Sequence, residues 1–378
     1  MERSPVNYIS YFLENSTAYV LFFMIAYSFM LVSLTQEGRS LKKVNYFYLA
    51  VLMVVFSGLR WSCGTDWEPY KVVFDSICAG QKRIDEHFDT GYVLLNKVIA
   101  VFSQDYTTFL LVDSFLAIFL ICKAIQKNKN TNKNVALYIF FLNYFCVHYM
   151  GSNRRIIAIG FLLNGFIAFF ERKYIIWLIL QVLAFYFHRA SIVGILAVFV
   201  PKKLLTTKKI YILIIISILL GLFQFSMKFI SQVANIALQI SNNQIFRLVD
   251  YYSSSVHEGK SAISFFFAIT KRAIFVFIFL HYRKYYKIED LRFNYYLNIY
   301  IFAVVIYSLL NGTGQFLTLT TYFTITEIFI WGILFNLIKR RNKLNMLLFL
   351  MFFGIFQMLN NFTTYTTAFL PYKSISIY

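Results

Sequence analysis

Charge is scarce in this 378-residue chain, since only 14% of its residues are charged whereas 59% are hydrophobic. A soluble protein is usually about half apolar and about a quarter charged. Apolar runs of about twenty residues, the length of a membrane-crossing helix, recur throughout. They do not alternate polar with apolar residues, which excludes a membrane β-barrel. The sequence therefore predicts an all-α, polytopic integral membrane protein, with residues 1–378 forming a single multi-pass membrane domain.

The sequence lacks the common nucleotide-binding and metal-binding motifs. The chain has no Gly-rich phosphate loop, Walker lysine motif or His-Glu-x-x-His zinc motif. Its four cysteines match no metal spacing, so we expect neither a metal nor a cofactor. Cys63 and Cys78 share a polar loop and could form a disulfide in an oxidising compartment. An enzyme of this kind must take its energy from a substrate that is already activated.

We predict about twelve membrane spans. They cover residues 18–34, 45–58, 107–125, 135–150, 156–170, 174–187, 190–200, 210–230, 262–280, 293–310, 316–338 and 344–360. The first run lacks a basic segment before it, so no cleavable signal peptide is expected. Residues 92–102 are too few to span, and we predict an amphipathic helix on the outer surface there.

Residues 174–200 are almost unbroken apolar sequence with basic loops at both ends, so this stretch must cross an even number of times. Two crossings of about 13 residues would each reach about 20 Å, short of a core about 30 Å thick. A broken or re-entrant helix pair with His188 and Arg189 at its turn fits better, and such breaks usually line a cavity.

Lys and Arg are unevenly distributed between the loops. More than half of the 36 basic residues lie in six loops, near residues 39–43, 123–133, 172–173, 202–209, 283–292 and 339–343. The positive-inside tendency places these loops in the cytoplasm and both termini outside. The net charge of +19 then reflects topology, and no nucleic-acid partner is expected. Residues 60–106 and 231–261 become two outward-facing segments.

Charged and aromatic residues gather where the second run ends. They are Arg60, Thr65, Asp66, Trp67 and Tyr70. Aromatic rings at that depth commonly anchor a protein at the interface, but a charged pair between them is less common. Arg60 is a candidate anion ligand and Asp66 a candidate general base. Alternatively, the two form an ion pair that only fixes the loop.

Two arginines, Arg154 and Arg155, occupy a short outward loop and open the span that follows. Free N–H groups and the positive helix end would add to their charge, and guanidinium suits phosphate. The sequence therefore predicts an anion site, with surface charges that reach lipid headgroups as the alternative.

Charges also fall within predicted spans. Lys271 and Arg272 lie midway along residues 262–280, where a basic pair is costly unless it faces a cavity or partner. Alternatively, that span begins near Ala273. Glu327 is a candidate counter-charge, and Asp113 lies shallower, where it could be a satisfied polar contact.

His188, at the proposed break, is a second candidate base. A lone histidine is more often structural, but an unperturbed pKa near 6.5 would permit proton exchange close to neutrality. Tyr251 and Tyr252 in the second outward segment are candidate sugar platforms, or else interface anchors.

Six short elements, taken in chain order, resemble the signature of the EpsG-like, Wzy-type polysaccharide polymerases. They are Gly58-Leu59-Arg60, Gly64-Thr65-Asp66-Trp67 with Tyr70, Asp89-Thr90-Gly91-Tyr92 with Leu95-Asn96, Asn153-Arg154-Arg155-Ile156-Ile157-Ala158, Phe187-His188-Arg189-Ala190-Ser191 and Pro371-Tyr372-Lys373. The sequence departs from the family pattern in two places. Arg155 stands where glutamine is usual, and Thr320-Thr321 precedes Tyr322-Phe323 where an arginine is frequent.

The resemblance implies a GT-C-like glycosyltransferase in the bacterial inner membrane, with its active site facing the periplasm or exterior. Such enzymes lengthen O-antigen, capsule or exopolysaccharide by moving a growing glycan from undecaprenyl pyrophosphate to an incoming lipid-linked repeat unit. Expected partners are the undecaprenyl-pyrophosphate-linked oligosaccharide, membrane lipid and a chain-length regulator protein. The alternatives are a flippase or transporter of lipid-linked oligosaccharide and an O-antigen-type ligase.

The expected site is an outward-facing cavity in which arginines hold the pyrophosphate. Asp66 and His188 are the expected catalytic residues. The expected substrate-binding residues are Arg60, Thr65, Trp67, Tyr70, Arg154, Arg155, Arg272 and Glu327.

Overall fold

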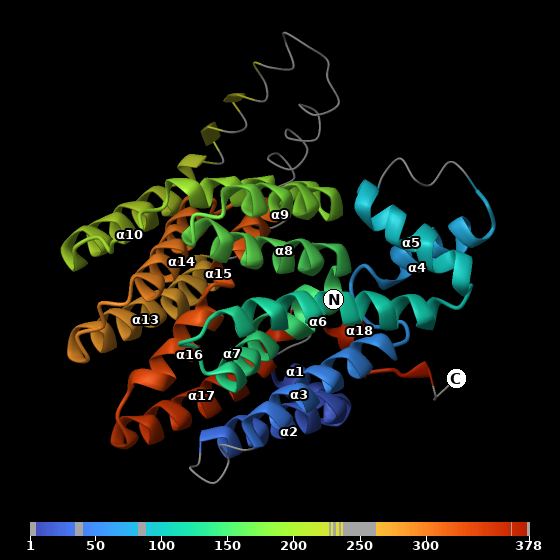
Figure 1. Ribbon diagram of the computed structural model, residues 1–378, viewed down its shortest axis with the longest axis horizontal. Helices are drawn as coiled ribbons and strands as arrows, with labels where there is room; N and C mark the ends of the chain where they lie inside the picture. The colour runs from blue at the N-terminus through green and yellow to red at the C-terminus, as the bar shows by residue number, and fades with distance from the viewer. Residues whose placement is uncertain are drawn as a thin grey trace. The chain divides into compact units, whose positions relative to one another are not determined.

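The computed structural model describes residues 5–34, 41–81, 88–226, 262–363 and 365–375, with a few positions between 228 and 236 (Figure 1). The residues that it describes are mainly helical, and their one β-type contact is an isolated bridge between Arg60 and Ser374. The chain divides into two compact units, one formed by Met1–Ile192 with Trp331–Tyr378 and the other by Val193–Ile330.

Most of the described helices belong to the first unit. They are α1 (Pro5–Asn15), α2 (Thr17–Leu34), α3 (Leu41–Gly58), α4 (Trp67–Cys78), α5 (Thr90–Phe102), α6 (Tyr106–Lys127), α7 (Lys133–Phe140), the π-helical segment η3 (Phe141–Tyr149), α8 (Asn153–Phe170), α9 (Tyr174–Phe187), α17 (Arg340–Asn361) and α18 (Thr366–Phe369). The second unit contains α10 (Thr207–Leu222), α13 (Ala262–Tyr285), α14 (Leu291–Leu309), the 3-10 segment η5 (Gly314–Thr320) and α15 (Thr321–Thr324). The 3-10 segment η4 (Arg189–Phe199) and α16 (Glu327–Leu337) each run from one unit into the other.

Five described helices are long and apolar enough to cross a membrane, judged by length and composition. They are Tyr106–Lys127, Asn153–Phe170, Phe265–Tyr285, Phe316–Leu337 and Arg341–Asn361. A bent pair, Tyr8–Asn15 with Thr17–Val32, adds a sixth if its two helices, which meet at 71°, form one span. The all-helical class is therefore confirmed for the described residues, which include five candidate membrane spans, whereas the count of about twelve and the GT-C-like architecture stay predictions.

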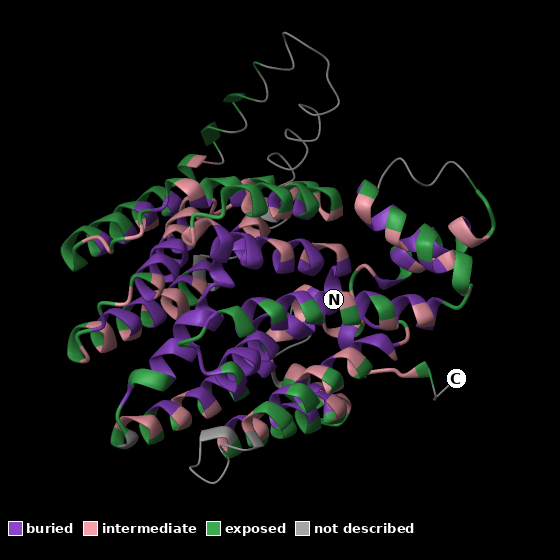
Figure 2. Ribbon diagram, viewed as in Figure 1, coloured by how far each residue is buried: buried purple, intermediate pink, exposed green. Residues whose placement is uncertain are grey.

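Burial separates the inner helices of the first unit from its outer ones (Figure 2). On α8, Gly160 packs so closely on α6 that a Cβ there would lie 2.7 Å from Leu120 Cβ. Asn164 Nδ2 donates to the Leu120 carbonyl at 2.9 Å, which gives this amide nitrogen a partner inside the contact. On α9, by contrast, only Gln181 and Ala184 are buried, and most of its large apolar side chains are exposed. So much exposed apolar surface suits lipid rather than water.

The predicted break in residues 174–200 is confirmed. Helix α9 ends at Phe187, His188 is extended with φ −156° and ψ 108°, and a 3-10 segment begins at Arg189. Gln181 Nε2 donates to the Ser191 carbonyl at 3.0 Å, so the chain folds back beside the end of α9. The helix predicted over residues 92–102 is also present as α5.

All four cysteines are free thiols, and Cys63 is buried. Cys63 Sγ lies 3.1 Å from Tyr19 Oη, and burial raises the pKa of its thiol to about 11. The thiol is therefore protonated and unreactive at neutral pH.

Candidate functional site

The loop between α3 and α4 is held by the C-terminal segment. Trp61 N donates to the Lys373 carbonyl at 2.9 Å, and Gly64 N donates to the Ala368 carbonyl at 2.7 Å. Gly64 has φ +121°, and a Cβ there would lie 2.0 Å from the Met150 carbonyl oxygen. Only glycine fits this turn, because the backbone conformation and the close approach both exclude a side chain. The turn brings residues 64–66 against the start of α8.

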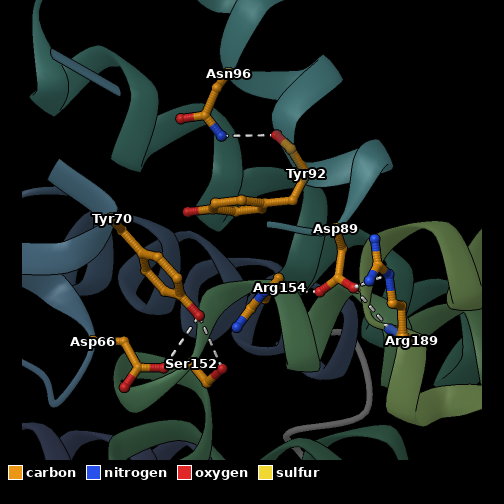
Figure 3. A network of polar contacts seen from close by, with 8 residues as sticks. All are labelled: Asp66, Tyr70, Asp89, Tyr92, Asn96, Ser152, Arg154 and Arg189. Atoms are coloured by element: carbon orange, nitrogen blue, oxygen red, sulfur yellow. Dashed lines mark hydrogen bonds and ion pairs between the residues drawn. The ribbon is translucent and has the colours of Figure 1, made fainter. Parts of the chain in front are cut away.

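Asp66 and Tyr70 lie beside the residue that precedes α8 (Figure 3). Tyr70 Oη lies 3.2 Å from Asp66 Oδ2, to which it donates, and 3.0 Å from Ser152 Oγ. Thr65 Oγ1 donates to the Gly151 carbonyl at 3.0 Å, which ties the same loop to the same turn. Tyr70 is buried and Asp66 is half-buried, so the carboxylate keeps a face toward the exterior of the unit.

Trp67 packs beneath the loop between α3 and α4. Its ring packs edge-on against Trp61 and Tyr106, at centroid distances of 5.1 and 5.5 Å. The indole is buried, with 7% of the residue exposed. Burial of this depth makes Trp67 a packing residue that supports Asp66, rather than a surface open to a sugar.

Asp89 joins two arginines from different elements (Figure 3). Its carboxylate accepts from Arg154 Nη1 at 2.8 Å, lies 3.6 Å from Arg189 Nε and accepts from the Arg189 backbone N–H at 3.1 Å. Arg154 also lies over the ring of Phe88, 5.0 Å from its centroid, and over that of Tyr70, at 5.9 Å. One carboxylate thus links the starts of α5 and α8 to the break after α9.

Arg60 lies beneath this site rather than on it, since only 1% of the residue is exposed. Its Nη1 donates to the Ser57 carbonyl at 2.7 Å and its Nη2 to Asn153 Oδ1 at 2.6 Å. The guanidinium also lies 5.7 Å from the ring centroid of Tyr149. The alternative ion pair with Asp66 is not formed among the described residues. In this structure Arg60 stabilises the junction of α3 and α8 and is covered from outside.

We therefore expect Asn153→Ala to destabilise the protein by about 2–3 kcal/mol, because it leaves the buried Arg60 charge without its side-chain partner. Thermal unfolding in detergent measures this. The control is Asn15→Ala, which removes an amide that bonds only one turn back, to the Tyr11 carbonyl at 2.9 Å. Equal melting temperatures for the two variants would show that Arg60 does not depend on Asn153.

Arg155 and His188 lie near one another beside Arg154. Arg155 is half-buried and forms no hydrogen bond or ion pair within the described part of the chain. Burial, followed by repulsion from Arg155 and Arg154, lowers the pKa of His188 to about 3. His188 is therefore neutral at pH 7, and the proton exchange near neutrality expected from an ordinary histidine does not apply to the free protein.

Arg272 and Glu327 belong to the second unit. The Arg272 guanidinium stacks on Tyr307, 3.6 Å from the ring centroid, and its Nη1 donates to the Ala268 carbonyl at 2.9 Å. Glu327 is buried with 4% exposure, and Tyr300 interacts electrostatically with both charges. The candidate charge Arg272 and its candidate counter-charge Glu327 thus share Tyr300 as a neighbour.

Sequence reasoning missed Asp89, Ser152 and Asn153 as site residues. Asp89 and Asn153 do lie in the elements that resemble the polymerase signature, which was the available signal. Ser152 carried none. The candidate sugar platforms Tyr251 and Tyr252 lie outside the described residues.

Together these features define a multi-pass helical membrane protein with a half-buried carboxylate and clustered arginines where several helices begin or break. Comparison with known families gives the particular class. The EpsG family model matches residues 43–374, and the chain belongs to the EpsG family. Its function is therefore that of a membrane polysaccharide polymerase-like protein. No match was found among curated proteins or among solved structures.

Proposed function

We propose that this protein is a glycosyltransferase that polymerises polysaccharide repeat units on the outer leaflet of the bacterial inner membrane. It would transfer a growing glycan from undecaprenyl pyrophosphate to a hydroxyl of an incoming lipid-linked repeat unit. About twelve spans in a GT-C-like arrangement and a chain-length regulator partner complete the proposal. Whether the product is O-antigen or exopolysaccharide would depend on the polysaccharide that the host bacterium makes.

One observation supports this proposal above the others: beside the start of α8, the same tyrosine of α4 contacts a carboxylate through its hydroxyl and a guanidinium through its ring. Tyr70 donates to Asp66 through its hydroxyl, while Arg154 lies over its ring at 5.9 Å. The reaction needs a base for the acceptor hydroxyl and a cation for the leaving pyrophosphate, close together. Both groups are available here at the positive end of a helix.

In the proposed reaction Asp66 takes the proton of the acceptor hydroxyl, whose oxygen forms a bond to the anomeric carbon of the growing glycan. The bond from that carbon to the pyrophosphate oxygen breaks, and the electron pair leaves with the pyrophosphate. Arg154, Arg155 and the free N–H groups at the start of α8 stabilise that charge. Neutral His188, beside both arginines, is suited to hydrogen bonding with the phosphate or sugar. The outward segments 60–106 and 231–261 would hold the sugars.

A flippase of lipid-linked oligosaccharide is the rival from another class. It would also need cations in a cavity, but with access from both leaflets and often with a structural repeat. An O-antigen-type ligase shares the donor and differs only in the acceptor.

Glycan analysis of a deletion strain separates these functions. Loss of a polymerase should leave single repeat units on the lipid carrier and on their final acceptor. Loss of a flippase should confine the lipid-linked unit to the cytoplasmic leaflet, and loss of a ligase should leave long chains on the carrier. Unchanged polymer in the deletion strain would refute the proposal.

A further inference from the structure

A cavity of about 950 Å³ lies between α3 and α6, in the first unit. Its walls are apolar, and Phe47, Phe115 and Phe119 are 63%, 60% and 48% exposed along its edges. The two helices touch at the other end of α3, where a Cβ on Gly58 would lie 2.5 Å from the Leu111 side chain. Helices α3 and α6 are therefore in close contact at Gly58, whereas the cavity lies between them nearer to Lys42.

The end of the cavity at the start of α3 is basic. Lys42, Lys43 and Lys133 line it, and none of them forms an ion pair with a described residue. The hydroxyl of Thr131 also belongs to the lining, and it is buried without a hydrogen-bond partner among the described groups. An unpartnered buried hydroxyl costs free energy unless a ligand or water pairs with it. The three lysines favour an anionic, oxygen-rich group at this end.

The length of the apolar wall matches one leaflet. From Lys43 to Val54, α3 rises about 16 Å at 1.5 Å per residue. Half of a hydrocarbon core about 30 Å thick is about 15 Å. An acyl chain whose headgroup lies among the lysines would therefore extend along this wall to the middle of the bilayer.

We propose that this cavity binds one acidic phospholipid, with its phosphate among Lys42, Lys43 and Lys133 and its acyl chains between α3 and α6. The distribution of Lys and Arg predicts that this end lies in the cytoplasmic leaflet, which supplies the lipid. A zwitterionic phospholipid of equal chain length has the same apolar complementarity but lacks the net negative charge. The cavity should therefore select by headgroup charge, and it is separate from the site at Asp66 and Arg154.

Native mass spectrometry of the purified full chain tests this with two probes of matched acyl chains, phosphatidylglycerol and phosphatidylcholine. We expect the wild-type protein to retain one phosphatidylglycerol at least tenfold more tightly than phosphatidylcholine. The triple variant Lys42→Gln, Lys43→Gln, Lys133→Gln should lose at least tenfold of that affinity, since each lysine near a lipid phosphate contributes about fivefold, or about 1 kcal/mol. The matched control Lys203→Gln, Lys208→Gln, Lys209→Gln removes equal charge from another predicted cytoplasmic loop and should retain the lipid.

A second variant tests the apolar part without changing charge. Ala50→Trp places a large ring within the lining and should reduce retention of phosphatidylglycerol by at least tenfold while the melting temperature stays near that of the wild type. Equal retention of the two lipids by the wild type would overturn the proposal, as would equal losses in the two triple variants. Selective retention of a polyprenyl phosphate over phosphatidylglycerol would overturn it in favour of a carrier-lipid site.

Discussion

Replacing Asp66 by asparagine is expected to lower the rate of glycan transfer about 100- to 10,000-fold, the usual contribution of a positioned general base. Asparagine keeps the shape of the side chain and can still accept from Tyr70, so the protein level should not change. The rate is measured with purified protein and lipid-linked repeat units. In cells, the same variant should accumulate single repeat units.

Asp75→Asn is the matched control for this experiment. Asp75 is an exposed carboxylate on the same helix, α4, where it pairs with Lys71, so its replacement should leave transfer unchanged. His188→Gln supplies the comparison with the second candidate base. If His188→Gln abolishes transfer and Asp66→Asn does not, the base is assigned to the histidine and the mechanism above is wrong in that step.

Arg154→Ala is expected to lower transfer about 100- to 1000-fold, the loss typical of removing one donor that stabilises a developing negative charge. Long chains should disappear while the protein level is retained. Lys173→Ala, which removes an exposed charge just beyond the other end of α8, should have no effect.

The structure adds an alternative that the sequence could not raise, because Arg154 pairs with Asp89 at 2.8 Å. If the arginine serves only to hold that carboxylate, Asp89→Asn should impair transfer as strongly as Arg154→Ala. If the arginine stabilises pyrophosphate, Asp89→Asn should be much milder. Full-length polymer from Arg154→Ala would remove the proposed pyrophosphate site.

The sequence predicted those parts of the fold that depend on local composition. The apolar run at residues 107–125 lies within α6, and a length argument located the break at His188 correctly. The same logic could not foresee that residues 141–149 form a π-helix, since an apolar run fixes burial but not the hydrogen-bond register. Nor could it fix how many helices cross the membrane: among the described residues, length and composition identify five, or six with the bent pair, where the sequence predicts about twelve.

The site was less predictable than the helices because its contacts join residues far apart in the chain. The charge of Arg60 predicts an anion ligand, yet its burial against Asn153 decides its role, and no sequence periodicity indicates that pair. Asp66 and Tyr70 are one helical turn apart, so their contact was accessible to sequence reasoning. Their junction with Ser152 and Arg154 depends on the turn at Gly64, whose neighbour Met150 only the folded chain supplies.

The carboxylate that joins α5, α8 and the break after α9 has a consequence for affinity. Arg154 is already paired with Asp89 in the free protein, so the proposed diphosphate would gain only the difference between two ion pairs. The proposed mechanism therefore predicts a weak affinity of the free protein for pyrophosphate, which would favour release of this product after each cycle. Because Asp89 directly precedes α5, its displacement from Arg154 would break the ion pair that joins the starts of α5 and α8.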